Sequence, residues 1–166
     1  MNEIFQLDLV FETSEAAIVQ RKEFLKQRRI GICDMVASAK REKIDASDLG
    51  MQDAQLRDLI QVLSENPTIH TLLFTGGNSK NGPEYFFRKL LKRYHLKLEV
   101  VSNEVPRIHE FLHPVTSKKI TTVSLIAPSG AANRAVGSLK TYKDLKKKNP
   151  EMTTVDFRVL QYRNFF

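Results

Sequence analysis

Cysteine is nearly absent from this chain of 166 residues, because Cys33 is the only one. A single thiol cannot form a disulfide within the chain, and it cannot supply the cysteine cluster of a structural zinc site. Cys33 lies in an apolar run, where a free thiol is ordinary core material. The sequence therefore predicts no disulfide framework, and we expect no metal and no cofactor.

Long hydrophobic runs are also missing from the sequence. No apolar stretch is long enough to cross a bilayer, and the first residues, MNEIFQLDLVFE, carry acids where a signal peptide carries Lys or Arg. We therefore expect a cytoplasmic protein with no membrane partner. With 42% hydrophobic residues the chain can build one core, so we predict a single domain over residues 1–166.

Acidic residues are outnumbered by basic ones, most strongly near the C-terminus. The formal net charge is +7, and from residue 134 onward eight Lys or Arg face three Asp or Glu. A cationic surface attracts polyanions because binding releases counterions from phosphate groups. Charge alone thus favours a nucleic-acid partner, although many basic domains bind no nucleic acid.

The spacing of apolar residues predicts an alternation of helices and strands. Helices are expected at 14–28, 53–64, 83–94, 138–148 and 153–166, and strands at 68–74, 96–101 and 120–126. Residues 30–36 fit a short buried strand or turn, and residues 102–117 fit an irregular excursion that forms a lid or a hairpin. Such alternation is typical of an α/β fold with a mainly parallel sheet covered on both faces.

Two loops follow predicted strands at their carboxyl ends. One begins at Thr75 and contains Gly76 and Gly77, and the other begins at Pro128. Ligands collect at this edge of a parallel sheet, so we expect the two loops to share one crevice. Four small side chains in a row, at 129–132, would let a large partner approach the backbone. A tight strand-to-helix turn is the competing interpretation.

Two other patterns do not develop into a site. Residues 77–82 have the glycine spacing of a P-loop, but Pro83 and Glu84 replace the Lys and Ser/Thr that would meet phosphate and magnesium. His109 and His113 are four residues apart, yet Pro114 argues against the helix that would bring them together on a metal. We therefore set aside a nucleoside triphosphatase and a histidine metal site.

Three segments in a fixed order resemble the uracil-DNA glycosylase superfamily. They are GICDMVASAKREKIDASDLG at 31–50, TIHTLLFTGG at 68–77 and LIAPSGAANRAVGSLKTYKDLK at 125–146. The mismatch-specific uracil/thymine enzymes and the hypoxanthine DNA glycosylases are the most similar branches. The resemblance implies a three-layer α/β/α domain that flips a damaged base out of DNA and hydrolyses its N-glycosidic bond.

The resemblance also implies roles for particular residues. Thr75, Gly76 and Ser38 would border the base pocket, and Asp34 is the candidate catalytic carboxylate, which would stabilise the cationic sugar. Thr75 offers a hydroxyl where several members of the superfamily carry Asn, so the base that is recognised stays open. The DNA-insertion loop would be Pro128, Ser129, Gly130, Ala131, Ala132 and Asn133. The phosphate contacts would be Arg134, Lys140, Lys146, Lys147 and Lys148.

The first motif of the superfamily, a Gly/Pro loop with an Asn or Asp that positions water, has no counterpart. No Gly precedes Gly31 and no Pro precedes Pro67. We expect the first strand to be absent, which would leave a sheet edge uncovered and favour a homodimer. The sequence thus predicts a DNA-repair glycosylase-like domain, catalytic only if the missing motif is supplied or another carboxylate substitutes. A non-catalytic nucleic-acid-binding relative and a small-molecule or protein-interaction domain of the same architecture are the alternatives.

Overall fold

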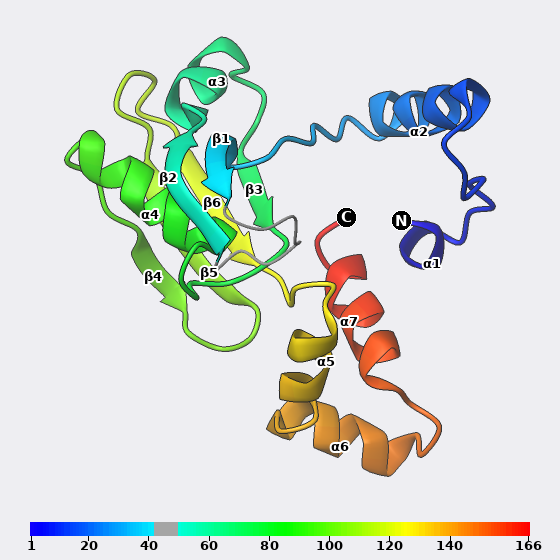
Figure 1. Ribbon diagram of the computed structural model, residues 1–166. Helices are drawn as coiled ribbons and strands as arrows, with labels where there is room; N and C mark the ends of the chain where they lie inside the picture. Colours follow the sequence, from blue (N-terminus) through cyan, green and yellow to red (C-terminus); the bar gives the residue numbers. More distant parts are fainter. Residues whose placement is uncertain (42–49) are drawn as a thin grey trace.

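The computed structural model describes residues 1–41 and 50–166, and its centre is a four-stranded sheet (Figure 1). The strand order is β3 (Thr71–Phe74), β6 (Lys119–Ser124), β5 (Arg107–Leu112) and β4 (Glu99–Ser102). Only β3 and β6 run parallel, because β5 is antiparallel to both of its neighbours. The fold is therefore α/β with a mixed sheet, and the prediction of a mainly parallel sheet is wrong.

Strand β5 is the element that changes the sheet. It lies within residues 102–117, which were predicted as an irregular excursion forming a lid or a hairpin, and it pairs with β4 as a hairpin. Pro106 precedes β5 and Pro114 follows it, so the prolines bound the strand and remove no hydrogen bond from its ladder. Within the strand, His109 and Phe111 point to the same face of the sheet because side chains alternate along a strand.

Helix α4 (Pro83–Arg93) covers that face of the sheet. It begins as predicted, with Gly82 at the N-cap position and Pro83 in the first turn. The side chain of Phe87 is fully buried, and its ring centroid lies 5.2 Å from that of Phe74 and 5.5 Å from that of Phe111. Aromatic packing between α4 and the strands thus forms the centre of the main hydrophobic core.

A two-stranded hairpin, β1 (Val36–Arg41) with β2 (Met51–Leu56), lies beside α4 (Figure 1). The predicted helix at 53–64 is only partly present, because α3 (Leu59–Glu65) begins after β2 has ended. Asp58 caps α3: its carboxylate accepts hydrogen bonds from the backbone N–H groups of the next turn. The apolar spacing in this region therefore spans a strand and a short helix.

The segment between α2 and β1 also differs from expectation. Residues 30–36 were predicted as a buried strand or turn, but residues 30–35 form a largely exposed connection in which Ile32 is 70% exposed. Cys33 is exposed as well, so its assignment to the core is wrong. Apolar composition predicts burial only where a partner surface lies close, and this connection has none along most of its length.

Strand β6 leads into three helices, α5 (Gly130–Val136), α6 (Lys140–Lys148) and α7 (Thr154–Arg163). Helices α6 and α7 confirm the prediction, and α7 starts with a capping box between Thr153 and Asp156. Helix α5 was not predicted. Helix α7 returns to the sheet, where Tyr162 packs with Val123 on the face opposite α4.

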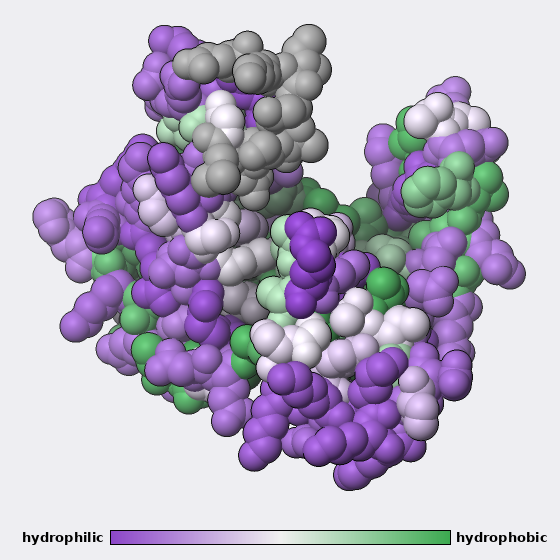
Figure 2. Space-filling view, turned by 60° about the horizontal axis from the view of Figure 1, so that its bottom comes forward, coloured by the Kyte–Doolittle hydropathy of each residue, from purple (hydrophilic) through white to green (hydrophobic). Residues whose placement is uncertain are grey.

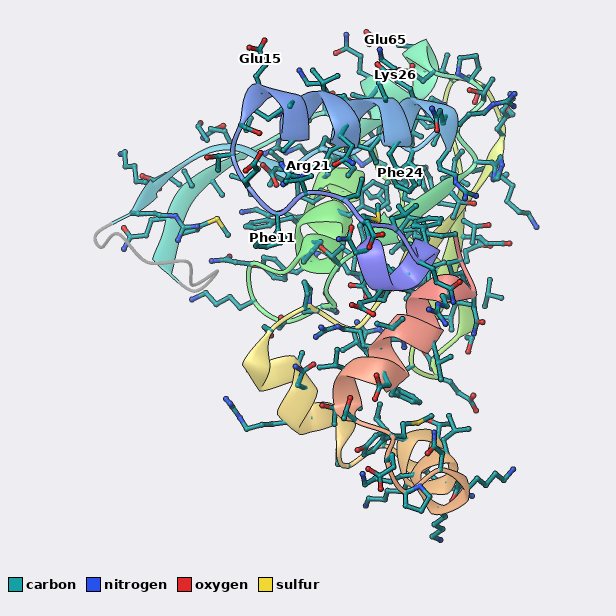
Figure 3. The ribbon with its side chains drawn as sticks, turned by 90° about the vertical axis from the view of Figure 1, so that its right-hand side faces the viewer. Phe11, Glu15, Arg21, Phe24, Lys26 and Glu65 are labelled. Carbon is teal, nitrogen blue, oxygen red and sulfur yellow. The ribbon has the colours of Figure 1, made fainter. Side chains whose placement is uncertain are left out.

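The N-terminal arm (residues 1–34) holds α1 (Asn2–Phe5) and the predicted helix α2 (Glu15–Gln27). The rings of Phe5 and Phe24 meet edge to face at 5.0 Å between centroids. In Figure 3, Phe24 points toward the rest of the arm and Glu15 points away from it. Figure 2 shows a notch between α2 and the body of the molecule. In the part of the chain that the structure describes, no helix is long and apolar enough to span a membrane.

Candidate functional site

The loops that follow β3 and β6 lie next to each other at one edge of the sheet. Phe74 pairs with Ser124 in the parallel ladder, and the N–H of Leu125 donates to the carbonyl of Phe74 at 2.8 Å. A methyl group placed on Gly76 would lie 3.9 Å from the Cβ atom of Ala127. The two loops are therefore adjacent, as the sequence led us to expect, and the one parallel strand pair of the sheet makes them so.

Helix α7 fixes the chain where it leaves β6. The side-chain oxygen of Gln161 accepts a hydrogen bond from the N–H of Ile126 at 2.8 Å, and the hydroxyl of Tyr162 donates to the carbonyl of Ile126 at 2.9 Å. The Nε2 atom of Gln161 is buried and has no hydrogen-bond partner among the described residues. Two side chains of α7 thus fix the start of the loop that follows β6.

The small-residue stretch after Pro128 is the first part of a helix. The hydroxyl of Ser129 accepts a hydrogen bond from the N–H of Ala132 at 3.2 Å, which caps α5. Pro128 through Ala131 are exposed, whereas Ala132 and Asn133 are half-buried. The oxygen of the Asn133 side chain accepts a hydrogen bond from Arg158 at 2.7 Å. The stretch is therefore a strand-to-helix turn in which Ser129, Gly130 and Ala131 face solvent.

A cluster of polar and charged side chains lies where α4 begins, near the loop after β3. We call it the Glu84 cluster, after the carboxylate at its centre. Oε2 of Glu84 accepts hydrogen bonds from Nη2 of Arg107 at 2.5 Å and from the hydroxyl of Ser124 at 2.6 Å. Oε1 accepts one from Nε of Arg88 at 2.9 Å. The members of the cluster are Glu84, Arg88, Arg107, His109 and Ser124.

The Glu84 carboxylate is buried and ionised. Burial opposes its charge, but the hydrogen bonds from Arg107, Ser124 and Arg88 outweigh burial and lower the pKa of Glu84 below its ordinary value. The side chain is only 1% exposed, and each arginine beside it is about one third exposed, at 32% and 33%. The charge of Glu84 is thus buried, while both arginine side chains reach solvent.

His109 accepts a hydrogen bond in this cluster. Its Nε2 atom lies 2.8 Å from Nη2 of Arg88, and a guanidinium can only donate, so Nε2 is unprotonated and the ring proton sits on Nδ1. Burial lowers the pKa of His109, and although Glu84 opposes this, Arg88 and Arg107 lower it further. The Nδ1 atom is buried with no hydrogen-bond partner in the described part of the chain. His109 is therefore neutral and orients Arg88.

Arg107 connects the cluster to the loop after β3. A methyl group on Gly77 would lie 3.0 Å from Nη2 of Arg107, which is tighter than nine in ten real contacts of a Cβ atom. Glycine at this position therefore leaves the space that the guanidinium occupies. The Glu84 cluster and the loop that begins at Thr75 form one continuous region.

The predicted base-pocket residues fall in two places. Thr75 is exposed and Gly76 is buried at the edge where the two loops meet, whereas Ser38 is exposed on β1 and pairs with Gln55. Ser38 helps to line an open hollow of about 780 Å³ between the hairpin and α4, together with Lys40, Ala39, Asp53, Ala54, Gln55, Lys89 and Arg93. Part of the first resembling segment, residues 42–49, lies outside the described residues.

Asp34 lies at the other end of the hairpin from the loops. Its backbone carbonyl accepts a hydrogen bond from Arg57 at 3.2 Å, and its side chain is exposed. The opposite end of the hairpin reaches the loop after β3, because the amide of Asn81 donates to the carbonyl of Met51 at 3.2 Å. The six residues of β1 separate Asp34 from that end of the hairpin, a span of roughly 20 Å. The structure does not bring Asp34 to Thr75.

The predicted phosphate contacts lie on α5 and α6, and all of them are exposed: Arg134, Lys140, Lys146, Lys147 and Lys148. Lys146 is held locally, because its ammonium donates to the carbonyls of Pro150 at 3.0 Å and Met152 at 2.8 Å. Lys147 lies 4.0 Å from Asp144. Figure 2 brings this side of the molecule forward and shows it to be largely hydrophilic.

Sequence reasoning did not find the Glu84 cluster. The spacing of Glu84 and Arg88, four residues apart on a predicted helix, was a visible signal, but its other members come from distant strands. Within residues 1–41 and 50–166, no group of three or more His, Cys, Asp or Glu side chains is placed to hold a metal ion. Comparison with protein-family models, with curated proteins and with solved structures gives no match to this chain.

Proposed function

We propose that this chain is a DNA-binding domain of the uracil-DNA glycosylase type, which recognises a damaged or mismatched base where the loops after β3 and β6 meet. One observation carries the proposal: the two loops that resemble this superfamily, at Thr75 and Pro128, are neighbours at the carboxyl ends of parallel strands. Ligands gather at this edge of α/β sheets. Uracil, hypoxanthine and mismatched thymine are the bases to test.

The surroundings of the loops suit a duplex. The exposed small side chains from Pro128 to Ala131 let a DNA backbone or base approach closely. Beyond them, α6 ends in Lys146, Lys147 and Lys148, where cations would meet phosphates and release counterions. Lys147 and Lys148 are the better candidates, because the ammonium of Lys146 is already bonded to backbone carbonyls.

Bond cleavage needs a group that positions water or stabilises the sugar cation. Asp34 lies far along the hairpin from Thr75, and Glu84 is occupied by three hydrogen-bond donors. Neither of these two carboxylates is therefore free at the junction of the loops after β3 and β6. The non-catalytic nucleic-acid-binding relative is thus the form of the function that we propose, and glycosylase activity is the alternative.

The test is binding and cleavage of matched duplexes that contain uracil, hypoxanthine, a G/T mismatch or no lesion. We expect tighter binding to a lesion, and abasic sites only if the alternative holds. Lys147→Gln with Lys148→Gln should weaken binding to all duplexes and reduce the slope of log K against log salt by about 1.8. Lys22→Gln with Lys97→Gln removes the same charge from exposed positions elsewhere and should leave the slope unchanged. No binding by the wild-type chain would refute the proposal.

A second variant tests the loop. Ala131 is exposed, so Ala131→Glu should abolish recognition of a lesion while leaving the melting temperature nearly unaltered. A large fall in melting temperature would instead make the loop a structural element.

The predicted homodimer is also a proposal. Among residues 1–41 and 50–166, β3 is an edge strand that pairs only with β6, and such edges present unpaired backbone groups to a second chain. Light scattering during size-exclusion chromatography decides it, since a monomeric mass at micromolar concentration would exclude the dimer.

A further inference from the structure

The Glu84 cluster contains more positive charge than its carboxylate can neutralise. Arg88 and Arg107 each carry one positive charge, Glu84 carries one negative charge, and His109 is neutral because its Nε2 atom accepts from Arg88. Arg88, which donates to Oε1, and the hydroxyl of Ser124, which donates to Oε2, would already supply donors to both oxygens of the carboxylate. The second guanidinium is therefore available for another anion.

The two guanidinium groups also keep unused donors. A guanidinium has five N–H groups. The hydrogen bonds described above use two of them on Arg88, toward Glu84 and His109, and one on Arg107, toward Glu84. Each arginine side chain is about one third exposed, so both reach solvent, and their remaining donors form no hydrogen bond with the described residues.

These donors are fixed in position before any ligand arrives. Both arginines bond the same buried carboxylate, which sets them side by side, and His109 holds the far nitrogen of Arg88. Gly77 leaves room for Nη2 of Arg107 beside the loop. Because little side-chain entropy is left to lose, an anion placed here would bind more tightly than one on two free surface arginines.

We propose that Arg88 and Arg107 form a phosphate-binding pair beside the loop after β3. The planar guanidinium matches the spacing of two phosphate oxygens, and two such groups can hold one tetrahedral anion from two sides. Naming the phosphate as one of the DNA backbone, close to the recognised base, rests on the proposed function. A free phosphate or the phosphate of a nucleotide has the same chemistry and is the other source.

The first measurement uses inorganic phosphate alone, at constant ionic strength, with the melting temperature as readout. Phosphate should raise the melting temperature of the wild-type chain, because a ligand that binds only the folded state stabilises it. The rise should be lost in Arg107→Lys, which keeps the charge and removes the fork, and it should be reduced in Gly77→Ala, which shifts the guanidinium by a few tenths of an ångström and keeps every charge. Gly31→Ala adds the same methyl group where no atom lies within 4 Å, and it should behave as wild type.

The second measurement uses the duplexes described above. Arg88→Gln should reduce the slope of log K against log salt by about 0.9, the value expected for one phosphate. A phosphate effect that these variants remove, with an unchanged DNA slope, would assign the pair to a free phosphate or nucleotide. The proposed phosphate-binding pair would be refuted if phosphate raised the melting temperature equally in wild type, Arg107→Lys and Gly77→Ala. It would also be refuted if phosphate raised it in none of them.

The two proposals can fail separately. If the wild-type chain binds no DNA, the proposed function falls, and the phosphate titration still decides the arginine pair. If Arg107→Lys loses its far-ultraviolet circular dichroism, Gly77→Ala carries the decision alone, because it keeps both arginine side chains and their charges.

Discussion

The face of the sheet beneath α4 has two halves of opposite character. Toward one end it is apolar, where Phe87 packs on Phe111 and Ile120 is 2% exposed. Toward the loops it is polar, with Glu84 and His109 almost fully buried. The same helix and the same strands build both halves, so the difference lies in the side chains and not in the fold.

The two halves differ in what they contribute: one mainly stabilises the fold, and the other mainly positions charged side chains. Apolar burial stabilises the folded chain in proportion to the area removed from water. A buried charge network contributes less, because desolvation offsets most of its attraction, and apolar side chains of similar size are often equally stabilising. The apolar half therefore supplies most of the stability, whereas the Glu84 cluster fixes two guanidinium groups beside the Thr75 loop.

The largest effect should come from emptying the apolar half. Phe87→Ala removes a fully buried ring that two other rings contact, and we expect it to lower the free energy of unfolding by about 3–5 kcal/mol. Urea denaturation measures this. Phe166→Ala truncates a ring that is 39% exposed and should cost much less. Similar losses of unfolding free energy in both variants would contradict the conclusion that the apolar half supplies the stability.

The next largest effect should come from the polar half. Glu84→Gln leaves two guanidinium groups facing a neutral amide, which we expect to cost about 2 kcal/mol, less than a fully buried pair because water reaches both arginines. Glu110→Gln is the matched control, since Glu110 pairs with Lys119 at 3.0 Å near the surface. That change should cost at most about 0.5 kcal/mol. A tolerated Glu84→Gln would show that the cluster is not held by its charge.

A smaller effect should appear with pH. The folded chain holds the proton of His109 less tightly than the unfolded chain, because its pKa is lowered. Stability from His109 is therefore present above the ordinary histidine pKa and is lost as pH falls through the lowered value. The lowered pKa of Glu84 adds a second loss at more acidic pH. Urea denaturation across this range should show the first loss in the wild type and not in His109→Gln, and identical profiles would contradict it.

The smallest effect should come from the boundary between the halves. Thr122 is fully buried between them, and its hydroxyl donates to the carbonyl of His109 over 3.5 Å, a long and weak bond. Thr122→Val keeps the shape, so we expect a change within about 1 kcal/mol in either direction. Thermal unfolding measures it, and a loss as large as that of Glu84→Gln would extend the polar half across the boundary.

Local sequence signals at the helix start predicted α4 and α2 correctly. Gly82 and Pro83 mark its start in the sequence, and Ser14 marks the start of α2 in the same way. The prediction of one helix at 53–64 was wrong at its start. Leu56 fits the helical spacing of apolar residues, but it is paired with Val36 as part of β2. Spacing alone cannot separate a strand that runs into a short helix from one longer helix.

The site was harder to predict than the fold. The adjacency of the Thr75 and Pro128 loops followed from two strands that favour a parallel pair. The Glu84 cluster could not be predicted this way, because Arg107 and Ser124 lie 23 and 40 residues after Glu84 in the sequence. Pro106 and Pro114 argued against a strand in the segment that carries Arg107. The sequence therefore predicted neither the register of β5 nor the face of the sheet on which Arg107 lies.

Helix α7 links the two ends of the chain to the edge of the sheet where the loops after β3 and β6 meet. Arg163 donates to the backbone carbonyls of Glu3 and Ile4, and two residues earlier Gln161 receives the N–H of Ile126. The termini consequently lie close together in Figure 1. Fluorescent dyes attached at the two ends would therefore report, through energy transfer, whether α1 leaves α7 when a ligand reaches the neighbouring loop.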